Sequence, residues 1–232
     1  MNEDTPILFT VWETPVRAQS GFAAALAAVW ALMTWLAGRG NPGRPLPLRL
    51  LVGFISMLAV VSADVSHAMA HIISARAAYA PVDEILLSHG MPRTIYFDND
   101  ITPQQHRMRA LGGPVYSGLA CLLVLALRRL APEDTIFHEV LGYTALAHGL
   151  ISAGSMAPLE MVDGGSILKW SLVEQGKTEE EADHAVQQVA KGSGTALTAT
   201  GLVIAGSPHR LVGFVLAAGG LITIIGSQWQ SR

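Results

Sequence analysis

The sequence is poor in charged residues. Only 14% of its 232 residues are charged, and the net charge is −3, whereas an average soluble domain is about 25% charged. It has no basic stripe, which argues against the nucleic-acid-binding proteins. Half of the residues are hydrophobic and the mean hydropathy is +0.38. These values predict an integral membrane protein that contacts the lipid bilayer.

Cysteine is scarce in this chain, and a secretory leader is not expected. The single Cys121 excludes an internal disulfide and, within an apolar run, is expected to be a buried small hydrophobe. Residues 1–19 do not read as a basic segment followed by an apolar core, so no cleavable signal peptide is expected. By contrast, glycine is plentiful, with 23 residues. Small residues let membrane helices approach closely, so this abundance suits a packed helical bundle.

The apolar runs predict an all-α polytopic membrane protein, since about 20 apolar residues span a bilayer core. Six membrane segments are expected, over residues 21–37, 48–78, 109–130, 133–157, 194–206 and 211–226, the fifth being short. Between the second and third, several prolines and a glycine interrupt residues 80–105. That pattern predicts a short strand pair or membrane-associated hairpin. The distribution of Lys and Arg only slightly favours a cytoplasmic location for the end of the second helix.

Three regions follow from this pattern. Residues 1–47 comprise an N-terminal segment and the first transmembrane helix. Residues 48–174 form the core, which ends in a short helix over 164–174. Residues 175–232 comprise a polar, helical insert and a closing pair of transmembrane helices. The acidic run in the insert is interpreted as a solvated face, with a regulatory contact as the alternative.

Two histidines, His67 and His71, lie four residues apart in the second apolar run. On a helix this spacing puts both imidazoles on one face. A histidine in a membrane helix is expensive unless it faces protein, water or a metal ion. The spacing alone leaves metal binding, polar packing and haem ligation open. If Asp163, in a later Asp-Gly-Gly, joins the pair, three ligands leave one position for water, as in catalytic zinc sites.

Together these motifs resemble the site-2 protease family of intramembrane zinc metalloproteases. That family pairs H-E-x-x-H on one membrane helix with N-x-x-P-x-x-x-L-D-G-G on a later one. Here residues 67–71 read HAMAH, residues 155–165 read SMAPLEMVDGG, and Gly113-Pro114 matches the glycine–proline opening of the intervening helix. The resemblance covers about residues 52–170. It implies that His67, His71 and Asp163 bind Zn²⁺.

The resemblance also implies a function. The chain would cleave a transmembrane segment of a client protein in a bacterial or archaeal cell membrane, and residues 80–105 would receive the unwound substrate. Neither the client nor the oligomeric state is predicted by the sequence.

Three polar positions of the family pattern are replaced in this chain. Ala68 stands where the family has the glutamate that moves protons during hydrolysis, and such assistance contributes about 10²–10⁴-fold. Ser155 replaces the asparagine of the second motif, and Ser117 replaces a common asparagine of the intervening helix. We therefore expect this chain to be inactive or nearly so. Ala68 is either a deliberate replacement or the mark of a naturally inactive pseudoprotease that binds or regulates; rescue by Glu160 is a minor alternative.

Other classes of function compete with this interpretation. A membrane haem protein would use histidines on separate helices, drawn from His67, His71, His138 and His148. A metal transporter would show several polar positions along one path and often an internal repeat, and none is evident. Two further sets of polar residues have alternative roles. His148 and Glu139 either line a water cavity or pack between helices, and Asp64 and Ser66 are candidates to hold the ligand histidines.

Overall fold

The computed structural model describes residues 5–88, 92–159 and 161–229. The chain forms two compact units, which we describe separately. The first comprises Met1–Ile101 and Gly112–Ala153, and the second Thr102–Leu111 and Gly154–Arg232. One helix, α3 (Pro103–Leu130), contributes its first residues to the second unit and the rest to the first. Glu160 lies outside the described residues, as does the segment 89–91 of the predicted hairpin.

The helices of the first unit follow the apolar runs. They are α1 (Phe22–Gly40), α2 (Leu46–Ala77), most of α3, and α4 (Ile136–Ser155) up to residue 153. The loop Asn41-Pro42-Gly43 ends α1, and Pro45 precedes α2, where a fixed φ suits a helix start. The two helices pack closely at Gly53 of α2, where an added Cβ would collide with the backbone of Thr34 on α1.

A four-stranded sheet in this unit corrects the all-α prediction. Its order is β1 (Ile7–Val11), β2 (Thr14–Ala18), β3 (Glu84–Leu87) and β4 (Arg93–Ile95). β3 and β4 are antiparallel, as the predicted strand pair requires, and β2 runs parallel to β3. The sequence pattern does not predict β1 and β2, because each is five residues long and only pairing with a distant segment buries β2. Whether this region associates with the membrane remains a prediction.

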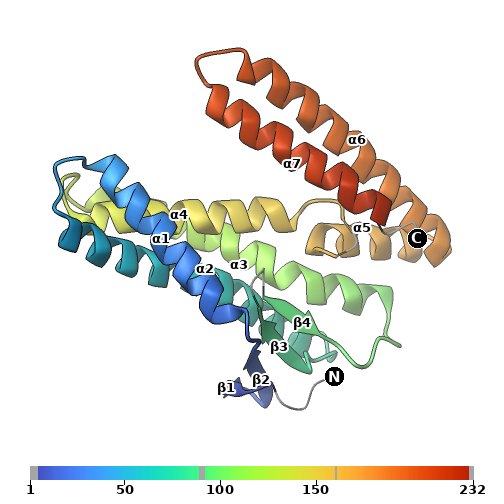
Figure 1. The fold of residues 1–232 in the computed structure, drawn as a ribbon. Helices are drawn as coiled ribbons and strands as arrows, with labels where there is room; N and C mark the ends of the chain where they lie inside the picture. The colour runs from blue at the N-terminus through green and yellow to red at the C-terminus, as the bar shows by residue number, and fades with distance from the viewer. Residues whose placement is uncertain (1–4, 89–91, 160, 230–232) are drawn as a thin grey trace. The chain divides into compact units, whose positions relative to one another are not determined.

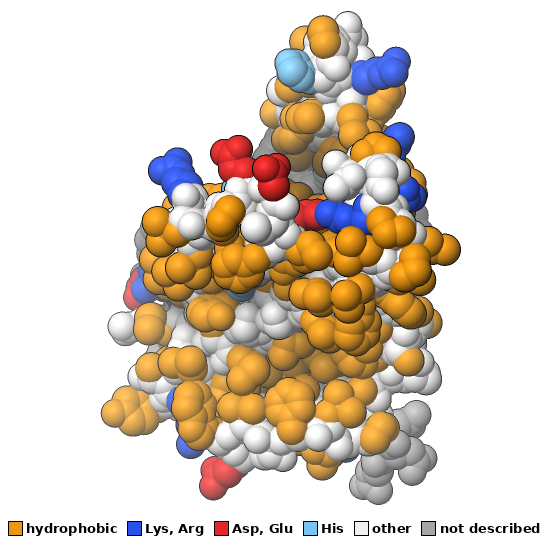
Figure 2. All heavy atoms as spheres, turned by 90° about the vertical axis from the view of Figure 1, so that its left-hand side faces the viewer, with side chains coloured by type: hydrophobic (Ala, Val, Ile, Leu, Met, Phe, Trp, Pro, Cys, Tyr) orange, Lys and Arg blue, Asp and Glu red, His pale blue; other side chains and the backbone are white. Residues whose placement is uncertain are grey.

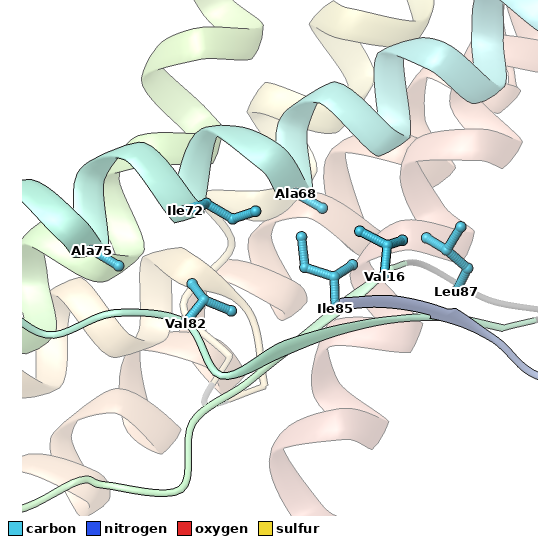
Figure 3. Close-up of a cluster of buried hydrophobic side chains, with 7 residues drawn as sticks. All are labelled: Val16, Ala68, Ile72, Ala75, Val82, Ile85 and Leu87. Carbon is cyan, nitrogen blue, oxygen red and sulfur yellow. The ribbon is translucent and has the colours of Figure 1, made fainter. Parts of the chain in front are cut away.

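A hydrophobic cluster joins the sheet to α2 (Figure 3). Ala68, Ile72 and Ala75 on α2 point toward the sheet. Their partners on the other side are Val16, Val82, Ile85 and Leu87. Because Ala68 and the two motif histidines share one helix, this cluster fixes α2 beside the sheet and orients the histidine-bearing turns.

The second unit is mainly a helical pair with a short helix before it. α5 (Asp163–Glu174) precedes α6 (Glu179–Ala205), which packs antiparallel along α7 (Arg210–Trp229) (Figure 1). The short helix predicted from residue 164 is confirmed as α5. Thr178 caps α6 through a capping box with Glu181. The sequence pattern predicts a polar insert separate from a fifth membrane segment, whereas α6 continues through both without a break.

Four helices in the described part of the chain are long and apolar enough to cross a membrane: α1, α2, α3 and α7. Many of their large hydrophobic side chains are exposed, and hydrophobic side chains cover much of the face in Figure 2. Length and composition thus support a membrane protein. The remaining two of the six predicted segments form helices α4 and α6 but fall outside this set, so six spans are not confirmed. α6 begins with three glutamates, and α4 carries His138, Glu139 and His148.

Candidate metal centre

The two motif histidines come together inside the first unit. His67 and His71 lie in the second half of α2 and are buried, with exposed fractions of 7% and 5%. Their Nε2 atoms are 3.3 Å apart, and their rings are nearly perpendicular, at 79°. Two nitrogens bound to one tetrahedral zinc ion at about 2.0–2.1 Å would be separated by about 3.3 Å. The pair therefore has the spacing of two ligands of a single ion.

Gly113 on α3 makes room in front of these nitrogens. A Cβ at this position would collide with the Nε2 atoms of both His67 and His71. A neighbouring glycine, Gly112, approaches α2 just as closely, at Ser74 and the Ala70 carbonyl. The glycine–proline motif thus keeps side-chain atoms away from the place where an ion would be bound. The two histidine nitrogens, and the space that Gly113 leaves beside them, fit a metal ion.

A serine holds the first histidine from behind. Ser117 Oγ on α3 lies 3.0 Å from Nδ1 of His67, and Ser117 is fully buried. If His67 binds a metal through Nε2, its Nδ1–H donates to the serine oxygen, which fixes both the tautomer and the ring orientation. In the sequence, Ser117 is visible only as a departure from a common asparagine. Its role became visible only when α2 and α3 were placed side by side.

The two partners suggested from α2 itself do not show this role. Ser66 Oγ donates to the Ala63 carbonyl of its own helix, at 3.1 Å. Asp64 lines a small cavity of about 120 Å³ together with Phe22 of α1 and Leu87 of β3.

We expect Ser117→Ala to weaken metal binding by about 10- to 100-fold, the usual effect of removing an outer-shell partner of a ligand histidine. Competition with a chromophoric chelator measures the affinity for Zn²⁺. Ser152→Ala is the matched control, since Ser152 Oγ also bonds to α3, but at the Pro114 carbonyl, 3.0 Å away. Equal affinities of the Ser117→Ala variant and the unmodified chain would contradict the assignment.

Ala68 faces the sheet and has no polar group to offer. It is 2% exposed and belongs to the apolar cluster with Val16, Ile72 and Ile85 (Figure 3). The position that holds a glutamate in the family pattern is therefore packed as a hydrophobic position in this chain.

The second motif lies in the second unit. Asp163 is the first residue of α5, where a carboxylate interacts favourably with the helix dipole, and it is partly buried. A Cβ at the next residue, Gly164, would collide with the backbone of Met156 and Ala157, so glycine is required for the tight turn before α5. Ser155 is the last residue of α4 and is buried.

The remaining polar residues of α4 have different surroundings. Glu139 is bound by Arg44 in a bidentate ion pair, with its Oε2 2.6 Å from Nη2, and this pairing raises the pKa of Arg44. Glu139 also accepts from Tyr143, so it is a packing residue rather than part of the histidine site. His138 Nδ1 donates to the Ala131 carbonyl, at 3.2 Å. His148 is buried and packs edge-on against Tyr116 of α3.

Comparison with solved structures supports the fold expected from the motifs. The chain is similar to the site-2 protease from Methanocaldococcus jannaschii, with a TM-score of 0.58 over 98% of this chain and 95% of that one. The sequences are 14% identical, so the likeness is one of fold. No protein-family model matches the sequence, and no curated protein does. The resemblance read from the motifs is thus confirmed for the architecture.

Proposed function

We propose that this chain is an intramembrane zinc metalloprotease of the site-2 type, which cleaves a transmembrane segment of a client protein in a prokaryotic cell membrane. The main support is the histidine pair, whose Nε2 atoms lie 3.3 Å apart with Gly113 leaving space in front of them. This pair belongs to a chain with the fold of a site-2 protease. The third ligand in the proposal is Asp163, whose Asp-Gly-Gly motif matches the family pattern.

Each residue has a defined task in this proposal. His67 and His71 hold the zinc ion through Nε2, and Ser117 fixes the tautomer of His67 from the opposite nitrogen. Asp163 supplies a negative charge that offsets part of the charge of the ion. When bound, zinc polarises the scissile carbonyl and makes water a stronger nucleophile. Ala68 can neither take nor give a proton, so turnover is expected to be slow.

A catalytically inactive relative is the second candidate function, and a specific observation favours it. Ala68 fits into the apolar cluster with Val16 and Ile85, so the chain has a packed hydrophobic core where a protease would need a carboxylate. Such a protein would bind transmembrane clients and zinc without cleaving them. Client binding with no cleavage by the metal-loaded chain would favour this function over proteolysis.

Metal analysis of the purified chain tests the zinc site that both candidate functions require. We expect about one equivalent of Zn²⁺ in the unmodified chain and a loss of most of it in His67→Ala, His71→Ala and Asp163→Ala variants. His138→Ala is the matched control, since that imidazole bonds to the Ala131 carbonyl near the other end of α4. Full metal content in His67→Ala, or absence of metal from the folded unmodified chain, would refute the proposal. Visible absorbance of a bound chromophore in the purified protein would instead indicate haem.

A further inference from the structure

His148 is a buried polar group of the first unit that the proposed site does not yet use. It lies on α4 with an exposed fraction of 5%. Among the described residues, its Nδ1 atom is buried without a hydrogen-bond partner. Leaving a buried polar atom without a hydrogen-bond partner is energetically costly. The atom is therefore available to a ligand or a water molecule.

The surroundings of His148 place it near the histidine pair. Its ring packs edge-on against Tyr116, with the ring centroids 5.9 Å apart. The next residue of α3 is Ser117, whose Oγ contacts His67. The imidazoles of His148 and His67 are also close enough to interact electrostatically. One turn further along α4, Ser152 bonds to the Pro114 carbonyl and ties the two helices together. The same stretch of α3 thus contacts both histidines.

We infer that His148 is the proton acceptor of this metal centre and takes the role that the family pattern gives to residue 68. The inference rests on the proposed function. In peptide hydrolysis, the oxygen of a water molecule bonds to the scissile carbonyl carbon, and one of its protons passes to Nδ1 of His148. The C–N bond then breaks and His148 returns the proton to the departing amine nitrogen. The base needs to be within reach of the water, directly or through one intervening water molecule.

Asp64 is a weaker candidate for this task. It shares a helix face with position 68 and, like His148, interacts electrostatically with His67, but it lines the small cavity with Phe22 and Leu87. That cavity lies between α1, α2 and the sheet, whereas Gly113 and Ser117 of α3 contact the histidine nitrogens. His148 packs against that same stretch of α3.

Binding of acetohydroxamic acid to the Co²⁺-loaded full-length chain tests this inference without turnover. The acid binds a metal as its anion, so the site must accept a proton, and changes in the Co²⁺ absorption bands report the binding. We expect His148→Phe to weaken acetohydroxamate binding by about 10- to 100-fold, the worth of a hydrogen bond to a charged group. The Co²⁺ content should stay at that of the unmodified chain. His138→Phe, on the same helix, should change neither quantity.

Repeating the measurement in the Ala68→Glu chain shows whether His148 accepts a proton or only packs against its neighbours. In the Ala68→Glu chain a carboxylate can take the proton, so adding His148→Phe should have less than about a threefold effect on acetohydroxamate binding. Equal losses in both backgrounds, or no loss in either, would overturn the inference. Loss of Co²⁺ from His148→Phe would also overturn it, because His148 would then be a ligand. Failure of the unmodified chain to bind Co²⁺ would instead refute the proposed function itself.

Discussion

Replacing Ala68 by glutamate is expected to raise the rate of cleavage of a helix-destabilised transmembrane substrate, by at most the about 10²–10⁴-fold that a general acid–base residue contributes, because His148 already supplies part of that assistance. The glutamate would follow the first ligand histidine, as in H-E-x-x-H metalloproteases. The rate is measured in liposomes with Zn²⁺-loaded protein, side by side with the unmodified chain. No other single change of this chain is expected to increase activity so strongly.

The same substitution should lower stability, because position 68 lies in the apolar cluster with Val16, Ile72 and Ile85. A carboxylate left in such surroundings without a partner is strongly destabilising. We therefore expect a lower melting temperature for the metal-free variant and partial recovery with Zn²⁺. Ala68→Gln is the matched control, since it has nearly the same size and polarity but cannot accept a proton at neutral pH. A glutamine variant as active as the glutamate variant would exclude the acid–base explanation. A folded, zinc-loaded Ala68→Glu protein with no activity would favour the pseudoprotease.

Gly113→Ala should abolish stoichiometric metal binding, which is the second large effect. The added Cβ would collide with Nε2 of both His67 and His71, so the two nitrogens could no longer converge on one ion. We expect a loss of zinc affinity larger than the 10- to 100-fold typical of an outer-shell change. Metal content after dialysis against a weak chelator, together with the chelator-competition affinity, measures this loss.

A glycine-to-alanine change elsewhere controls for the general effect on a helix. Gly192 lies in α6 and has no atom within 4 Å of a Cβ built upon it, so Gly192→Ala should retain full zinc content. The melting temperature of metal-free Gly113→Ala separates a local collision from unfolding. A folded Gly113→Ala protein that still binds one equivalent of zinc with unchanged affinity would show that the ion does not lie between these nitrogens.

The sequence determined which residues are candidates for the chemistry. The spacing of His67 and His71 requires that they share a helix face once that segment is helical, because side chains four residues apart lie one above the other. The prolines and glycine between residues 80 and 105 interrupt any helix, so strands there were predictable. The absence of a carboxylate at residue 68 is likewise evident from the sequence, since Ala68 follows His67 directly.

The tertiary structure decided what surrounds those residues. Ser117 is 50 positions away from His67, so only the packing of α3 against α2 shows that it holds the imidazole. β1 and β2 could not be predicted because β1 pairs with β2 and β2 pairs with the distant β3, a contact that the local sequence pattern does not encode. For the same reason the orphaned Nδ1 of His148 could not be read from the chain. The spacing of the two ligand histidines is local and can be read from the sequence. Whether a buried side chain finds a hydrogen-bond partner depends on contacts between distant segments.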